Sequence, residues 1–535
     1  MIGSEWWRNA TVYQIYPLSF ADADGDGVGD LRGIIDHLGH LAGETHSLGI
    51  DAIWLSPIYR SPMVDFGYDV ADHCAVDPRF GTLHDADDLI EQAHSRGLRV
   101  LLDLVPNHTS DEHEWFRRAR TARADRYRDW YVWADPAPDG GPPNNWLSAF
   151  ERVGRAWTFD EPTGQYYLHS YTPQQPDLNW RNPAVRAAMH DVMRFWLDRG
   201  VDGFRVDAPH RLGKDELLRD NAPDVVNLRV ATQLDERRHR NIDDPVVHTF
   251  LREMRAVTDS YPDRVLIGEV GVHHPVRRRD YFGAGDELRM VFDFGFWSNP
   301  WCADAFRRSG AEQAAVIVAG GWPTHALSNH DLSRHASRYA DPAVADARAT
   351  ARARAAAVLL TTLPGTTFLY YGEEIGMTDV PVPDDCATDP DGREPERTPM
   401  QWDFTLGHGG FSTVTPWLPM PAAGPDVRSQ SADPGSLLSL YRDLLRLRRT
   451  HPCLRSPEYA DLDAGPDVYA FRRTDRLVVA INFADASRPA AIAPESGIAD
   501  ATVALSSGVR LPGAIVDLSE LVLEPDEALV LDVTG

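Results

Sequence analysis

The chain has 535 residues, of which 43% are hydrophobic and 25% charged, a composition typical of a folded globular protein and unlike that of a disordered or fibrous one. Its 80 acidic and 53 basic side chains give a formal net charge of -27, which repels nucleic acids and anionic membrane surfaces and favours a neutral partner. No run of 18 apolar residues occurs and no basic segment precedes an apolar one at the N-terminus, so we expect neither a membrane span nor a secretion signal.

The cysteines indicate a reducing compartment. Cys74, Cys302, Cys386 and Cys453 are far apart in the sequence and form no Cys-x-x-Cys pair. This spacing favours reduced thiols over disulfides or zinc ligands. We therefore expect a cytoplasmic protein.

Short apolar runs alternate with segments of helical period, as in a parallel sheet built from βα units. Eight runs begin near Val12, Ala52, Arg99, Gly203, Val265, Met290, Ala326 and Thr367. Plausible helices between them cover Leu83 to Arg96, Ala184 to Arg199, Val246 to Ser260 and Val344 to Thr362. Eight strands with intervening helices predict a (β/α)8 TIM barrel.

Two stretches interrupt this alternation. The segment after the third strand, roughly 108–178, is rich in Trp, Tyr, Pro, Gly and Asn without helical period, and we interpret it as an inserted subdomain. Beyond about residue 453 the runs become short and alternating, which predicts a C-terminal antiparallel β-domain. The expected division is barrel 1–107 and 179–453, inserted subdomain 108–178, and β-domain 454–535.

An acidic, Gly-containing loop follows the first predicted strand. Oxygen ligands for a hard cation occur at alternate positions, namely Asp22, Asp24, Asp26, the Val28 carbonyl and Asp30. The loop begins like an EF-hand, but its twelfth position is Gly33 rather than a bidentate Glu. The alternative is an empty turn in which Asp30 simply caps a helix beginning at Leu31.

Polar side chains also gather at the C-terminal ends of the predicted strands, where barrel enzymes carry their catalytic groups. These are Asp103 and His108 after strand three, Arg205 and Asp207 at strand four, Glu269 after strand five, and His330 and Asp331 after strand seven. Glycoside hydrolysis needs one ionised and one protonated carboxyl flanking the bond. Arg205 favours the ionised form of Asp207, while the apolar run before Glu269 favours its protonated form.

Four motifs carry a family resemblance. DLVPNH at 103–108, GFRVDA at 203–208, GEV at 268–270 and SNHD at 328–331 resemble, in order and spacing, those of the α-amylase family, glycoside hydrolase family 13. The resemblance implies Asp207 as nucleophile, Glu269 as acid/base and Asp331 as the third carboxylate. It also implies that His108, Arg205 and His330 bind the sugar at the cleaved subsite.

Two further motifs, QPDLNW at 175–180 and ERTPMQWD at 396–403, resemble the oligo-1,6-glucosidase and α-glucosidase branch. That resemblance implies a structural Ca2+ in the 22–30 loop, with Mg2+ as an alternative, and no organic cofactor. It also implies that Asp65 pairs with Arg397 to grip the terminal glucose, that Tyr68 stacks on the sugar ring, and that Phe150 and Trp157 line the pocket.

The expected function is therefore that of a retaining, exo-acting α-glucosidase acting on short α-glucosides. Ala208, directly after the nucleophile, resembles the small residue of α-1,4-preferring members, where α-1,6-preferring members have Val. The alternatives are an α-1,6-glucosidase, a sucrose-hydrolysing, transglucosylating or isomerising enzyme, and a non-catalytic amylase-like scaffold. The charged insertion at 210–244 departs from better-known members and leaves the leaving-group contacts open.

Overall fold

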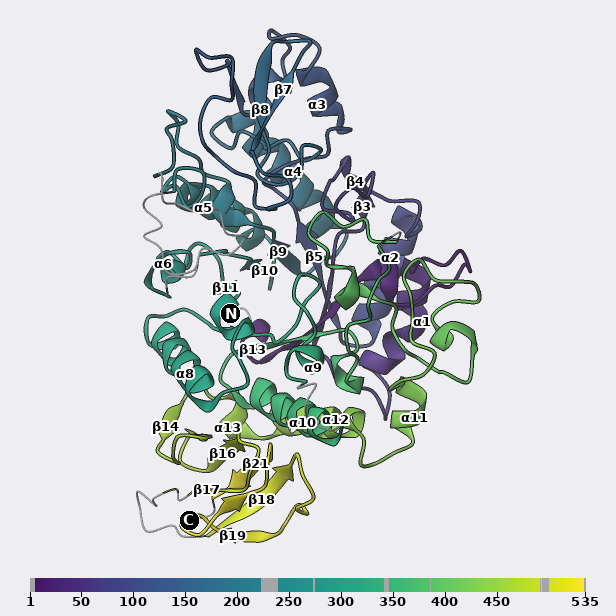
Figure 1. Cartoon of the computed structure of the whole chain (residues 1–535), viewed down its shortest axis with the longest axis vertical. Helices are drawn as coiled ribbons and strands as arrows, with labels where there is room; N and C mark the ends of the chain where they lie inside the picture. Colours follow the sequence, from purple (N-terminus) through teal and green to yellow (C-terminus); the bar gives the residue numbers. More distant parts are fainter. Residues whose placement is uncertain are drawn as a thin grey trace.

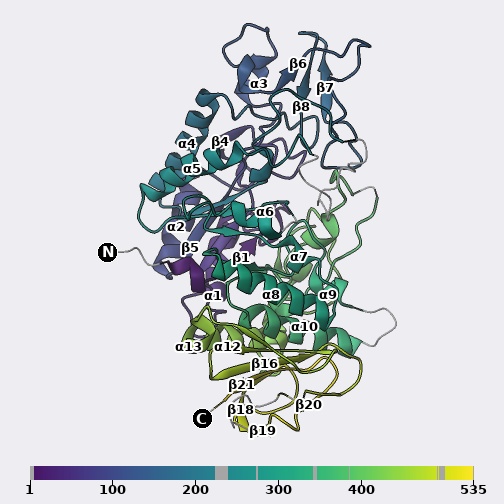
Figure 2. The same cartoon turned by 90° about the vertical axis from the view of Figure 1, so that its left-hand side faces the viewer.

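The computed structural model describes residues 5–222, 239–272, 275–340, 346–384, 386–490, 492 and 500–533. Figure 1 shows three parts along the long axis of the molecule: a small β-rich subdomain at one end, a barrel in the middle and a second β-domain at the other end. The view turned by 90° in Figure 2 shows the same order. The charged insertion predicted at 210–244 is described only at its two ends.

Eight parallel strands form the central barrel, in the order β11-β10-β9-β5-β2-β1-β13-β12. Their bounds are β1 Thr11–Ile15, β2 Ala52–Leu55, β5 Arg99–Leu104, β9 Gly203–Val206, β10 Val265–Gly268, β11 Met290–Val291, β12 Thr324–His325 and β13 Thr366–Tyr370. A parallel bridge between Val291 and Pro323 joins the two ends of the sheet. The predicted TIM barrel is confirmed, although the seventh strand ends at His325, before the run that begins at Ala326.

Helices surround the barrel. The described helices of this part are α1 Leu31–Leu41, α2 Leu83–Ser95, α4 Pro183–Asp198, α5 Val247–Asp259, α6 Pro275–Asp280, α7 Phe294–Trp297, α8 Ala303–Val318, α9 His335–Arg338, α10 Asp346–Thr362, α11 Val427–Ser431, α12 Leu437–Thr450 and α13 Pro452–Arg455. Side-chain caps define several starts. Asp30 accepts from the Gly33 amide at the start of α1, and Thr82 and Asp85 form a reciprocal capping box at α2.

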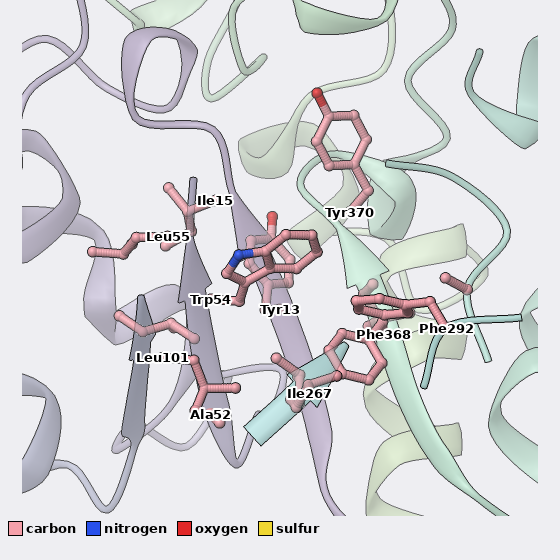
Figure 3. Packing of buried hydrophobic residues seen from close by; sticks show 14 of the residues in the cluster. Tyr13, Ile15, Ala52, Trp54, Leu55, Leu101, Ile267, Phe292, Phe368 and Tyr370 are labelled. Atoms are coloured by element: carbon pink, nitrogen blue, oxygen red, sulfur yellow. The ribbon is translucent and has the colours of Figure 1, made fainter. Parts of the chain in front are cut away.

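Large apolar side chains fill the barrel interior. Trp54 packs against Phe292 and Phe368, with ring centroids 5.7 and 6.3 Å away, and the two phenylalanines meet edge to face at 4.7 Å (Figure 3). These residues come from β2, from the segment after β11, and from β13. The barrel is therefore a packed core, and substrates can reach only its rim.

The inserted segment contains more regular structure than its sequence predicts. It holds helix α3 (Glu114–Ala119) and a three-stranded antiparallel sheet in the order β6-β8-β7, formed by Trp133–Ala134, Gln165–Leu168 and Trp157–Asp160. Trp146 and Trp157 stack with centroids 6.0 Å apart in a small buried cluster with Ala156 and Leu168. The hairpin strands β3 (Tyr59–Arg60) and β4 (Asp72–Val76) lie between β2 and α2 in the chain.

The C-terminal part is an antiparallel β-domain, as predicted. Its main sheet has the order β14-β15-β16-β21-β18-β19, formed by Ala460–Leu462, Val468–Arg473, Leu477–Asn482, Ala528–Asp532, Asp500–Ser506 and Ile515–Asp517. A second pair joins β17 (Arg488–Pro489) to β20 (Val522–Leu523). Arg348 and Arg352 of α10 both bind the buried Asp526, which ties this domain to the barrel. Among the described residues, no helix combines the length and apolarity needed to cross a bilayer.

Candidate active site

The strand register brings Asp207 and Glu269 to the same level of the barrel. Val206 of β9 pairs with Leu104 of β5 on one side and with Gly268 of β10 on the other. The Asp207 amide then donates to the Leu104 carbonyl at 2.8 Å, and the Glu269 amide donates to the Val206 carbonyl at 3.0 Å. Both carboxyl groups are thus positioned by main-chain hydrogen bonds of the sheet.

A single buried guanidinium connects the carboxyl groups of this rim. Arg205 Nη1 donates to Asp103 Oδ1 at 2.6 Å and to Asp207 Oδ1 at 2.8 Å, while its Nη2 lies 2.8 Å from Glu269 Oε2. The Arg205 side chain is 1% exposed. Three carboxyl groups share one cation, so full ionisation would leave a net negative charge in a poorly solvated place.

This arrangement changes the expected titration of the nucleophile candidate. Burial raises the pKa of Asp207 well above its ordinary value, Glu269 and Asp103 raise it further, and Arg205 opposes them. Burial also raises the pKa of Asp103 to about 6. Arg205 does favour the ionised form of Asp207, as expected, but burial and the neighbouring carboxyl groups outweigh it and raise the pKa. The rim favours keeping a proton among its carboxyl groups, as acid catalysis requires.

Asp331 is held by two arginines on the opposite side of the rim. Its Oδ1 accepts from Arg393 Nη1 at 2.9 Å and from Arg397 Nη2 at 3.0 Å. Arg397 also donates through Nε to the His330 carbonyl at 2.6 Å, and Asp389 accepts from both arginines. Asp331 is therefore oriented by charge-assisted hydrogen bonds.

The predicted pair of Asp65 with Arg397 is wrong in its partner. Asp65 Oδ1 accepts from Arg393 Nη2 at 2.5 Å, and Asp65 Oδ2 accepts from Gln175 Nε2 at 2.8 Å. Arg393 caps the start of the 3-10 turn Glu394–Arg397, and Arg397 is its last residue. Both arginines therefore face the same region. Arg397 binds Asp331 and Asp389 instead of Asp65.

Tyr68, His330 and His108 lie below the carboxyl groups. Tyr68 hydroxyl lies 3.0 Å from Asp103 Oδ2 and 2.6 Å from His330 Nε2, and the two rings stack with an interplanar angle of 4°. Gln175 Nε2 lies 3.1 Å from His108 Nε2 and so connects His108 to Asp65. Burial lowers the pKa of His108 to about 4 and that of His330 well below its ordinary value, so both rings are neutral near pH 7.

A pocket with a volume of about 280 Å³ opens at this rim. Its lining includes Asp207, Glu269 and Asp331 together with Asp65, Tyr68, His108, Ala149, Phe150, Tyr171, His210, Arg211, Gly271, Phe294, Trp297, Ser298, Asn329, Leu332 and Arg393. Arg205, His330 and Arg397 support these side chains from behind. Phe150 is a lining residue, whereas Trp157 belongs to the core of the inserted subdomain and does not line the pocket.

Ala208 occupies an unusual backbone conformation beside the pocket. Its φ is 40° and its ψ is 46°, in the left-handed region that residues other than glycine rarely adopt. Its amide donates to Glu269 Oε2 at 3.4 Å, and the residue is fully buried. Strained backbone of this kind is concentrated at functional sites.

Sequence reasoning missed several residues of this site, among them Arg393, Asp389, Gln175 and Tyr171. Arg393 and Asp389 lie just before the ERTPMQWD motif, and the repeat of arginines at positions 393 and 397 is the signal that two cations share a face. Gln175 opens the QPDLNW motif without having been assigned a role. Tyr171, in the inserted subdomain, packs on both His108 and Phe150 with centroid distances of 5.2 and 5.3 Å, and no motif distinguishes it.

The acidic loop near the N-terminus brings together part of the predicted ligand set. Carboxylate oxygens of Asp22, Asp24 and Asp30 lie within 4.8 Å of one another, whereas Asp26 falls outside this group. Asp22 accepts from the Gly25 and Gly27 amides, and Gly27, with φ 95°, sits so close to the Thr415 carbonyl that a Cβ would lie 2.6 Å from it. Burial raises the pKa of Asp24, and the charges of Asp26, Asp30 and Asp22 raise it further.

Paired carboxyl groups from neighbouring strands over a small rim pocket of a TIM barrel are the arrangement that glycoside hydrolysis requires. The family model described as "Alpha amylase, catalytic domain" matches residues 14–457. A probable α-glucosidase of Rhizobium meliloti (strain 1021) is 42% identical over 88% of this chain and 87% of the relative. An oligo-1,6-glucosidase of Parageobacillus thermoglucosidasius is 36% identical over 98% of both chains.

A solved structure of an α-glucosyl transfer enzyme, XgtA, superimposes with a TM-score of 0.87 at 37% identity and covers 99% of both chains. The chain therefore belongs to the α-amylase family of glycoside hydrolases, in its α-glucosidase branch.

Proposed function

We propose that the protein is a retaining, exo-acting α-glucosidase that releases glucose from the non-reducing end of short α-glucosides. The observation that carries this proposal is the attachment of Asp207 and Glu269 to one guanidinium from neighbouring strands. Retention requires two carboxyl groups on either side of one glycosidic bond, close enough for direct attack by one of them. The strand register supports that spacing.

In the proposed mechanism, Asp207 attacks the anomeric carbon while Glu269 gives its proton to the departing oxygen. Glu269 then takes a proton from water, which attacks the same carbon and releases the sugar from Asp207. Arg205 binds both carboxyl groups throughout, so it stabilises the rim as charge moves between them. Asp331, held by Arg393 and Arg397, binds sugar hydroxyls and favours the distorted ring.

Exo action is supported by the Asp65 and Arg393 pair. Arg393 bridges Asp65 and Asp331, and its guanidinium lies 5.0 Å above the Phe150 ring. A buried salt bridge at this place closes the space beyond a terminal glucose and leaves a pocket where an endo-acting enzyme needs a groove. We therefore propose that maltose and short oligosaccharides are better substrates than soluble starch.

Preference for α-1,4 linkages is supported by Ala208. Its amide contacts Glu269, the group that protonates the leaving oxygen, although its side chain is fully buried and does not line the pocket, so its size would act through the position of Glu269. One relative is named an oligo-1,6-glucosidase and one similar structure an α-glucosyl transfer enzyme, so α-1,6 cleavage and glucosyl transfer are the competing activities. All three share the same proposed covalent intermediate and differ in leaving group or acceptor.

The experiment that tests the proposal is NMR observation of the first glucose released from maltose. Double displacement gives the α-anomer first, and initial β-anomer would remove Asp207 from the nucleophile role. Product analysis with maltose, isomaltose, sucrose and trehalose distinguishes hydrolysis from transfer and ranks the linkages. Asp207→Asn is expected to lose several orders of magnitude in turnover while its circular dichroism spectrum stays unchanged.

We further propose that the 22–30 loop binds a structural Ca2+, with Mg2+ as the alternative. The donor set fits a hard cation, because Asp22, Asp24 and Asp30 offer three carboxylates in one small volume. Burial raises the pKa of Asp24, and the charges of Asp26, Asp30 and Asp22 raise it further. A bound Ca2+ would neutralise this repulsion and fix the loop. Asp30 also caps α1, so the ion would stabilise the start of that helix.

A reducing compartment such as the cytoplasm is supported by the spacing of the cysteines, which are far apart in the sequence and form no Cys-x-x-Cys pair. The acidic charge supports neutral glucosides as partners in preference to nucleic acids or membranes.

A further inference from the structure

Arg211 has an unusual position among the cations of the pocket. It lies four residues after Asp207, on the 3-10 turn Pro209–Arg211, and it is 3% exposed although it lines the pocket. Its amide donates to the Ala208 carbonyl at 2.9 Å, so its main chain is fixed next to the nucleophile. The proposed mechanism assigns it no role.

The other arginines of the site are all neutralised by carboxylates. Arg205 binds Asp103, Asp207 and Glu269, and Arg393 and Arg397 bind Asp331 and Asp389. The guanidinium of Arg211 has no carboxylate or hydrogen-bond partner among the described residues, and its Nη1 is buried without any acceptor. An unpaired buried charge is costly, so the position is explained best by a ligand that supplies negative charge.

The surroundings of Arg211 strengthen this point. Its guanidinium lies 5.3 Å from the centre of the Tyr171 ring, which holds it by a cation–π contact but gives it no counter-charge. Lys214, three residues further on, is fully engaged with Asp177 and Asn107 at 2.7 and 2.8 Å. Burial lowers the pKa of Lys214 and of His239, and the charge of Arg211 lowers both further. In the described part of this loop, Lys214 therefore has a carboxylate partner and Arg211 has none.

The 3-10 turn that carries Arg211 contacts the loop after Glu269. The neighbouring His210 accepts from the Gly271 amide at 3.2 Å, and Gly271 follows Glu269 by two residues. A Cβ on Gly271 would lie 2.8 Å from His210 Nε2, so the two loops are in close contact. Glu269 protonates the leaving oxygen in the proposed mechanism, whereas Asp65 and Arg393 close the opposite, glucose-binding end. The 3-10 turn that carries Arg211 is therefore in contact with the loop that follows Glu269, the residue assigned to the leaving group.

We propose that Arg211 is a specificity-determining residue that binds an anionic substituent, a carboxylate or a phosphate, on the leaving group of the α-glucoside. The inference rests on the proposed α-glucosidase function and names the chemistry of its leaving group. A neutral hydroxyl can accept a hydrogen bond from the guanidinium, but only an anion also compensates its charge. The planar fork of arginine matches the two oxygens of either anion.

Matched substrates test this proposal. Maltobionate and maltitol have the same open-chain leaving group except that the first ends in a carboxylate, and trehalose 6-phosphate and trehalose form the corresponding phosphate pair. The measurement is the ratio of kcat/KM for the charged and neutral member of each pair. In Arg211→Gln at least one ratio should fall about tenfold or more, and the pair that responds identifies the anion. Arg211→Lys should keep part of the preference, and high salt should lower the wild-type ratio.

The matched control is Arg194→Gln, which removes an exposed arginine of α4 and should leave both ratios unchanged. Ratios measured on one preparation do not depend on the fraction that is folded, and thermal melting identifies a variant that fails to fold. Unchanged ratios in Arg211→Gln, with the neutral substrates still cleaved, overturn the role of Arg211 alone. If no α-glucoside is cleaved, the proposed function fails. Calorimetric titration of maltobionate and maltitol into Asp207→Asn, with and without Arg211→Gln, then still decides the anion site, since equal affinities overturn it.

Discussion

The partner of Asp65 can be tested by a double-mutant cycle. Arg393 joins three carboxylates, with Nη2 2.5 Å from Asp65 and 2.7 Å from Asp389, and Nη1 2.9 Å from Asp331. A hydrogen bond to a charged group contributes about 1.5 to 3 kcal/mol, so Arg393→Gln, which disturbs both Asp65 and Asp331, should cost at least about 3 kcal/mol in transition-state stabilisation. That corresponds to a loss of about 100-fold or more in kcat/KM for maltose.

Asp65→Asn and Arg393→Gln remove the same salt bridge, so the double variant should be less damaged than the sum of the single effects, by about 1 to 3 kcal/mol. The control cycle combines Asp65→Asn with Arg397→Gln, because Arg397 binds Asp331 and Asp389 but makes no hydrogen bond to Asp65. Its coupling energy should be clearly smaller. Initial rates with maltose at low substrate concentration give kcat/KM for every variant. A coupling to Arg397 equal to or larger than that to Arg393 would refute the assigned pairing.

Three further predictions concern pH, linkage and metal. Burial raises the pKa of Asp103 to about 6 and that of Asp207 above its ordinary value. We therefore expect kcat/KM for maltose to fall as the pH drops below about 6. A profile in which kcat/KM falls only near pH 4 would contradict this. The same raised pKa means that Asp103 contributes most to the free energy of unfolding below about pH 4, and that this contribution is lost as the pH rises through 6. Ala208→Val should narrow or reverse the ratio of kcat/KM for maltose over isomaltose, by about 10- to 200-fold, and isomaltose beating maltose in the unmutated enzyme would contradict the linkage proposal. EDTA should lower the melting temperature and added Ca2+ should restore it. The variant Asp24→Asn should show neither response. A melting temperature that EDTA does not change, with no metal found by elemental analysis, would mean that the loop is empty.

The barrel and the position of its carboxyl groups were predictable because both depend on local patterns. Each strand is a short apolar run, and parallel strands necessarily present their C-terminal residues at one rim. The sequence alone therefore places Asp207 and Glu269 at the same rim. The extent of the strand near Ala326 could not be predicted, because pairing with β13 ends at His325 whatever the apolar character of the residues that follow.

Side-chain partners were less predictable than side-chain positions. Whether Asp65 meets Arg393 or Arg397 depends on the path of the segment between β13 and the 3-10 turn at Glu394–Arg397, which has no periodic pattern. The titration of Asp207 was misjudged because sequence proximity to Arg205 was visible, whereas the sharing of Arg205 with Asp103 and Glu269 was not. Trp157 was assigned to the pocket from its place in an aromatic stretch, but its stacking on Trp146 depends on the fold of the inserted subdomain.

The barrel is closed between β11 and β12, the first and last strands in the order of its sheet, by a single bridge between Val291 and Pro323. Strands such as β1 and β13 pair over four residues, whereas β11 and β12 are two residues long and this place is closed by one bridge, from Val291 of β11 to Pro323, directly before β12. Opening free energies vary within a protein, and they are lowest where few backbone hydrogen bonds must break. The segment after β11 carries Phe294 and Trp297 to the pocket wall. The part of the barrel with the fewest strand pairs therefore lies next to the segment that forms one wall of the pocket, whereas β9 and β10, which position Asp207 and Glu269, pair with each other over four residues.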